Sequence, residues 1–151
     1  MGLELRNGAW QFPLVIPQQD SPKPPTVLVF WIIWFAILQG LVAIQFFVGG
    51  GIPKGVDQAN PPQWVLAVAG GLALAALAIR FTWIPRIKSV PRKLPAMIVG
   101  LAFSEGIGFL GMFVVGNEFP ATRLSCLVLA ICCIVSLAPV YAKERAENGR
   151  F

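Results

Sequence analysis

The chain contains no histidine and little charge of either sign. The missing histidine removes the commonest metal ligand, the usual general base and the ordinary switch of physiological pH. Charged residues make up 13% of the chain and hydrophobic residues 56%, whereas a soluble domain carries about 25% charged residues. The composition therefore predicts a membrane protein, and we expect no metal ion and no cofactor.

Cysteine is scarce, and its placement excludes a disulfide framework. Cys126, Cys132 and Cys133 lie in a single apolar run, without the CxxC spacing of redox and metal sites. We interpret all three as small apolar residues of a helix.

The basic residues indicate contact with lipid. The formal net charge is +5, but the lysines and arginines flank apolar runs and are not interleaved with aromatic residues, so nucleic acid is not an expected partner. An enzyme is not expected either, because the serines and cysteines have no histidine to activate them as nucleophiles.

Four apolar runs approach the roughly 20 residues that a helix needs to cross a bilayer. Lipid admits only helices and closed barrels, and these runs are continuous rather than alternating, so we predict helices. The predicted helices cover about 27–48, 64–84, 95–116 and 122–141. The predicted fold is an all-α membrane protein of two antiparallel hairpins, in which Pro139 kinks or ends the last helix.

The chain divides into a transmembrane domain, 27–141, and two flanking segments. We do not expect residues 1–26 to form a signal peptide, because Pro13 interrupts their short apolar stretch. We expect this segment to lie on the membrane surface, to pack on a neighbouring subunit, or to form a loosely ordered tail. Residues 142–151 form a second tail.

The distribution of basic residues predicts the orientation. Ten of the twelve lysines and arginines lie in the two tails or in the segment from Arg80 to Lys93. This excess is typical of cytoplasmic segments, so we expect a multi-pass protein of the bacterial inner membrane with both termini in the cytoplasm. The residues that we expect to contact lipid head groups are Arg80, Arg86, Lys88, Arg92 and Lys93. Among these, Arg80 is expected to snorkel from inside the second helix.

A single acid, Glu105, lies at the centre of the third run, near the bilayer midplane. A charged side chain there costs from about 3 to more than 10 kcal/mol. The low dielectric favours its neutral, protonated form, and Ser104 could donate a hydrogen bond to it. Three interpretations are open: a hydrogen bond between helices, the binding of a proton or cation, and contact with a substrate or partner.

The first and third runs resemble each other. Residues 36–42 (AILQGLV) align with 102–108 (AFSEGIG), which matches Gln39 and Gly40 with Glu105 and Gly106. A duplicated helical hairpin would produce this pattern. Gln39 either shares the ion-binding site with Glu105 and Ser104 or only forms a hydrogen bond between helices.

Small residues predict close helix packing. Gly100, Ser104 and Gly108 recur at intervals of four along the third run, and such a pattern allows two helix backbones to approach closely. We expect Glu105 to lie at or next to the seam between the second and third helices. The residues assigned to helix packing are Gly40, Ala69, Ala73, Ala76, Gly100, Gly108 and Gly111.

Residues 104–114 (SEGIGFLGMFV) resemble the ion-binding helix of the proteolipid c subunit of rotary ATP synthases. The resemblance extends over about 64–116, including a helix rich in small residues and a basic, proline-containing loop. The regular glycine stripe of the first c-subunit helix is missing, and the chain has one further helix on each side. The resemblance implies that Glu105 occupies the position of the carboxylate that binds a proton or sodium ion, in a ring or other homo-oligomer.

Two functions follow from these observations. The first is a proteolipid-like subunit that binds a proton or cation at Glu105 within an oligomer. The alternative is a structural or accessory subunit of a larger membrane complex, without transport activity of its own, that docks through its small-residue faces.

Overall fold

The computed structural model describes residues 27–57 and 60–142. These residues contain helices and no strand, and four helical stretches are long and apolar enough to cross a membrane. The predicted all-α membrane protein with four transmembrane helices is therefore confirmed. The N-terminal segment 1–26 and the tail from 143 onward lie outside the described residues.

The four stretches contain several elements. The first is α1 (Val27–Phe47). The second joins α2 (Gln63–Ala78), a π-helical turn η1 (Ile79–Trp83) and α3 (Ile84–Arg86). The third joins α4 (Val90–Phe109) and a second π-helical segment η2 (Leu110–Val115). The fourth is α5 (Pro120–Ser136), which is followed by a 3-10 turn η3 (Pro139–Ala142).

Prolines shape these stretches in different ways. The third helix starts at Val90, five residues before the predicted start at Pro95, so that boundary was wrong. Pro91 lies in the first turn of α4, where its missing N–H costs no hydrogen bond, and Pro95 lies inside the helix. In η1 the backbone widens just before Pro85, whose ring nitrogen cannot donate to the carbonyl four residues back. The fourth helix ends at Ser136, shortly before Pro139, as expected.

The longer third stretch keeps its acid near mid-span. Glu105 lies ten residues after Pro95 and ten residues before Val115, which corresponds to about 15 Å in each direction at 1.5 Å per residue. Only the turn that begins at Val90 extends beyond the hydrocarbon thickness of about 30 Å.

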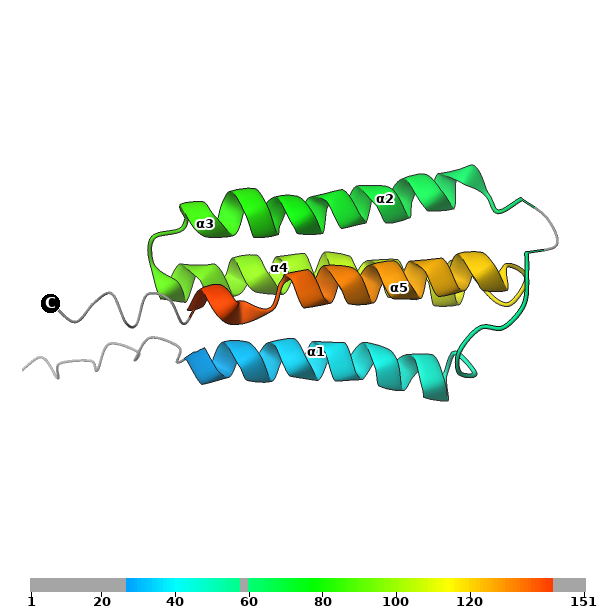
Figure 1. The fold of residues 1–151 in the computed structure, drawn as a ribbon, viewed down its shortest axis with the longest axis horizontal. Helices are drawn as coiled ribbons and strands as arrows, with labels where there is room; N and C mark the ends of the chain where they lie inside the picture. Colours follow the sequence, from blue (N-terminus) through cyan, green and yellow to red (C-terminus); the bar gives the residue numbers. More distant parts are fainter. Residues whose placement is uncertain (1–26, 58–59, 143–151) are drawn as a thin grey trace, which may run out of the picture.

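The helix α4 lies at the centre of the bundle and contacts α1, α2 and α5. Figure 1 shows α1 and α2 on opposite sides of the α4–α5 pair. The two helices of the first predicted hairpin therefore run antiparallel but are separated by the second hairpin. As a result, α1 packs on α4, α5 and η3.

Glycines of α4 and η2 allow neighbouring helices to approach closely. A Cβ atom added to Gly108 would lie 2.6 Å from Leu41 Cδ1 in α1, and one added to Gly111 would lie 2.7 Å from Cys126 Cβ in α5. A Cβ atom on Gly100 would meet Leu137 at 3.1 Å. By contrast, no described atom lies within 4 Å of the corresponding position at Gly40, so no helix of residues 27–57 and 60–142 approaches that glycine closely.

The small-residue face predicted for the second helix is buried. Ala69, Ala73 and Ala76 are at most 7% exposed, and α2 packs on α4. The close contact between the second and third transmembrane helices is therefore confirmed.

Replacing Gly111 with alanine tests the approach of η2 to α5. We expect the Gly111→Ala variant to lose about 1–3 kcal/mol of unfolding free energy, because the new methyl group overlaps Cys126 Cβ. The matched control is Gly40→Ala, which meets open space and gains helix propensity. Unfolding of the purified protein by SDS in mixed micelles, followed by circular dichroism, measures both variants. Equal unfolding midpoints for the two variants would contradict the packing described here.

Candidate functional site

Glu105 lies at the edge of the buried face of α4. Ser104 and Gly108, on the same helix, are buried, whereas Glu105 is only partly buried. Gly108, three residues after Glu105, faces Leu41 of α1, whereas Ala102, three residues before it, is exposed. The side that faces α2 is marked by Gly106, whose added Cβ would contact Leu72. Glu105 lies on the arc between these two sides, about 60° from Gly108 and about 100° from Gly106 around the helix axis. Its place at or next to the seam between the second and third helices stays a prediction.

The hydroxyl of Ser104 does not hydrogen-bond to Glu105. Ser104 Oγ donates a hydrogen bond of 2.9 Å to the carbonyl oxygen of Gly100, one turn earlier in α4. Among residues 27–57 and 60–142, no group hydrogen-bonds to the Glu105 carboxyl or forms an ion pair with it. The carboxyl therefore lies near mid-span with its polar atoms unsatisfied by the described chain.

Gln39 lies at a similar depth but on another face. The contact between Gly108 and Leu41 sets the register of α4 against α1, and the two helices run in the same direction (Figure 1). Because Gly108 is level with Leu41, Glu105, three residues earlier in α4, is level with Leu38, three residues earlier in α1. Gln39 is two residues from the buried Leu41, hence on the opposite side of α1, and it is exposed. The structure does not bring Gln39 and Glu105 together within one chain.

The described residues offer few ligands for a metal cation at Glu105. The described residues contain no group of three His, Cys, Asp or Glu side chains that could hold a metal. Hard cations such as Ca²⁺ and Mg²⁺ take about six or more oxygen ligands, and Glu105 supplies only its two carboxylate oxygens. A proton needs no further ligand.

The cations expected at the lipid head groups divide into two sets. Arg80 Nε donates a hydrogen bond of 2.7 Å to the carbonyl oxygen of Ser136, and its guanidinium lies 4.7 Å from the ring centroid of Tyr141. Arg80 thus caps the C-terminus of α5, where a positive charge is favourable, which corrects the expectation that it snorkels to the head groups. Lys93 is buried, with its ammonium 5.5 Å from the same ring.

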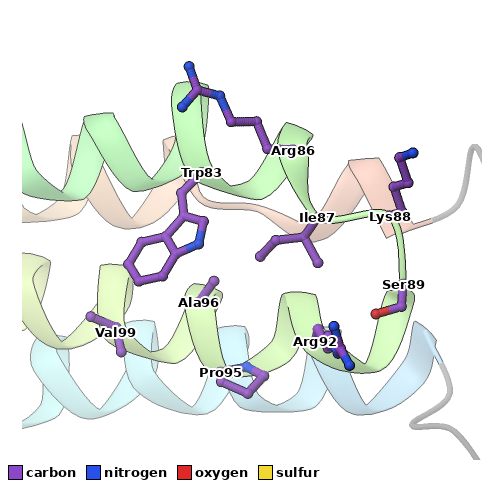
Figure 2. Close-up of a pocket in the computed structure, with 9 residues that line it drawn as sticks. All are labelled: Trp83, Arg86, Ile87, Lys88, Ser89, Arg92, Pro95, Ala96 and Val99. Atoms are coloured by element: carbon purple, nitrogen blue, oxygen red, sulfur yellow. The ribbon is translucent and has the colours of Figure 1, made fainter.

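The other three cations remain at the surface. Arg86, Lys88 and Arg92 are exposed and line an open cavity between α3 and α4, which Figure 2 shows in close-up. We call this end of the bundle, where α3 meets the start of α4, the basic end.

Sequence reasoning missed a polar cluster at the opposite end. The carboxylate of Asp57 accepts hydrogen bonds from the backbone N–H of Ala121 at 2.8 Å and of Thr122 at 3.1 Å. It also accepts one from Thr122 Oγ1 at 2.5 Å. Asp57 therefore caps the N-terminus of α5 across 64 residues of sequence.

Arg123 completes this cluster and is 5% exposed. Its guanidinium donates hydrogen bonds to the carbonyl oxygen of Gly49 and to Asn117 Oδ1, whereas its buried Nε has no partner. It thereby ties the end of α1 to the start of α5. A signal was present in the sequence, because Arg123 is the only charged residue in the predicted run 122–141.

No family model, curated protein or solved structure matches this chain. The resemblance of residues 64–116 to the proteolipid c subunit therefore stays a prediction.

Removing the cap at Asp57 tests the polar cluster. We expect Asp57→Ala to lower the unfolding free energy by about 1–2 kcal/mol, because two N–H groups at the start of α5 lose their acceptor. Hydrogen exchange should show faster exchange at Ala121 and Thr122. The matched control is Glu118→Ala, an exposed acid of the adjacent turn, which should change stability by less than about 0.5 kcal/mol. Unchanged exchange at Ala121 in Asp57→Ala would rule out the cap.

Proposed function

We propose that this integral membrane protein is a subunit that binds and releases a proton at Glu105, at a contact with a second copy of the chain. The observation that carries the proposal is the state of this carboxyl, which lies near mid-span and is partly exposed. It has no hydrogen-bond or ion-pair partner in the described residues.

The energetics support proton binding. An ionised carboxylate in hydrocarbon without a partner is costly, and intramembrane acids usually face a bundle interior or a water-filled cavity. A bound proton removes the charge, so the neutral carboxyl can face lipid or a neighbouring helix. A water path or a nearby cation would stabilise the ionised form again and release the proton.

The position of Glu105 at the edge of the bundle supports an oligomeric contact. Neither Ser104 nor Gln39 donates a hydrogen bond to Glu105 within one chain. The Ser104 hydroxyl donates to the carbonyl oxygen of Gly100, and the Gln39 side chain is exposed on another face of the bundle. A helix from a neighbouring subunit could cover this edge and supply a donor. The resemblance of residues 64–116 to the proteolipid c subunit, which implies a ring or other homo-oligomer, agrees with this arrangement.

Labelling with dicyclohexylcarbodiimide tests the proton site, because this apolar reagent reacts with protonated carboxyls. In the protein reconstituted in nanodiscs, we expect mass spectrometry to find the label on Glu105. The labelling rate should fall as the pH rises, since an ionised carboxylate does not react. Glu105→Gln should abolish the label while circular dichroism remains that of the folded protein, and the matched control Glu118→Gln should keep it.

The choice between a proton and a sodium ion is tested in the same assay. Excess NaCl should leave the labelling rate unchanged relative to choline chloride, because a single carboxyl supplies too few oxygens for a cation. Protection by NaCl would instead indicate a sodium site built from several subunits. An unreactive Glu105 at every pH would overturn the proposed function.

A second candidate function, that of an accessory subunit, is favoured by the outer face of α2. Ala67, Gly71 and Ala78 are exposed on this helix, and a Cβ atom added to Gly71 would meet no atom within 4 Å. Small residues at these positions allow another helix to approach closely beside Leu74, which projects from the same face. In contrast, Gly100 and Gly108 are already occupied by side chains of this chain.

The two functions respond differently to mutation. If the protein is an accessory subunit, Gly71→Leu should abolish co-purification with its partner in mild detergent, and Glu105→Gln should leave the complex intact and active. If Glu105 binds the working proton, Glu105→Gln should stop activity in an assembled complex. A wild-type protein that stays a lone monomer in mild detergent would contradict the accessory function.

A further inference from the structure

The basic end of the bundle contains an open cavity of about 700 Å³ between α3 and the first turns of α4. Its apolar lining includes Trp83, Ile87 and Val99, and its polar lining includes Arg86, Ser89 and Arg92. In Figure 2, Trp83 and Ile87 project into the space between the two helices, whereas Arg86 extends away from it. Arg92 and Ser89 lie at the start of α4.

The two kinds of lining lie at different depths. Arg92 lies in the first turn of α4, and Val99 lies seven residues further along the same helix, a distance of about 10 Å along its axis. A ligand that extends along the membrane normal would therefore place one end among cations and the other end against apolar side chains.

No acid of the described residues lies at this end of the bundle. The acids among the described residues are Asp57, Glu105 and Glu118. Glu105 is near mid-span, and the other two lie at the opposite end of the bundle. Neither Arg86 nor Arg92 forms an ion pair among the described residues, and the Ser89 side chain does not cap α4. The N-terminus of α4 adds a partial positive charge beside Arg92.

From this combination we propose that the cavity binds one anionic phospholipid, with its phosphate at Arg92 and Ser89 and an acyl chain against Trp83 and Val99. A guanidinium and a hydroxyl are suitable donors to phosphate oxygens, and basic pockets between transmembrane helices are typical sites for anionic lipid heads. A soluble phosphate would use only the polar rim and would leave the apolar lining empty. The site goes beyond the proposed function, because it does not involve Glu105.

Native mass spectrometry of the full-length protein in neutral detergent tests this site. Titration with phosphatidylglycerol should show one molecule bound more tightly than the rest, and phosphatidylcholine should not reproduce it. Arg92→Gln should weaken the tight binding about tenfold, the usual consequence of losing a charged hydrogen bond. Trp83→Ala should weaken it several-fold through loss of the apolar contact.

The matched control is Lys54→Gln, which removes one exposed cation from the opposite end and should leave phosphatidylglycerol binding unchanged. Circular dichroism and the elution profile confirm that each variant is folded. Equal affinity for phosphatidylcholine, or an unchanged affinity in Arg92→Gln, would overturn the proposal. It would also fail if glycerol 1-phosphate competed at the concentration of the lipid, since the cavity would then recognise a soluble phosphate.

Discussion

The absence of water in the hydrocarbon layer requires that every backbone polar group find a partner in the protein, and the ends of α5 show how this chain meets that requirement. Asp57 accepts hydrogen bonds from the first N–H groups of α5. At the other end, Trp34 Nε1 donates to the carbonyl oxygen of Ile134 at 2.7 Å, and Arg80 Nε donates to that of Ser136 at 2.7 Å. These side chains come from α1, η1 and the loop between the first two stretches. The two ends of α5 therefore fix the position of α1 and of the second stretch relative to the fourth. An unsatisfied group in lipid costs several kcal/mol, whereas apolar contacts with protein and with lipid are similar. Polar contacts therefore decide much of the arrangement.

Steric fit decides the rest. The glycines of α4 and η2 leave space for Leu41 and Cys126, which places α1 and α5 against the same central helix. Dispersion between helices that touch at such short range is a main attraction available in lipid, where hydrophobic burial contributes little. The result is a bundle in which α4 is the most buried stretch and α1 the least. The exposed side chains of α1 are compatible with lipid contact, as expected for an integral membrane protein.

Against this background, Glu105 is an exception. The chain satisfies the ends of α5 across long sequence separations, yet it leaves one mid-span carboxyl without a partner in the described residues. The three residues that the sequence grouped as an ion site do not meet in the structure. A rotation of about 100° per residue turns Ser104 and Glu105 to different faces of α4, and Gln39 belongs to α1. Ser104 bonds its own helix and Gln39 faces outward. What remains in one chain is a single carboxyl at an uncovered edge, and this is the physical basis for proposing a proton and an oligomeric contact.

The sequence alone was sufficient for the number of spans, their helical nature and the depth of Glu105, because these depend only on local hydropathy and on the thickness of a bilayer. It also predicted the packing of α2 on α4, since small residues on one face are a local pattern. The start of α4 was misplaced because proline is tolerated in the first turn and, here, inside the helix at Pro95. Only the tertiary structure decided that α1 and α2 are separated and that Arg80 caps α5. It likewise decided that Asp57 meets Thr122 and that Ser104 bonds to its own helix. These features depend on the rotation of each helix about its axis and on which helix lies beside it, and hydropathy along the chain records neither.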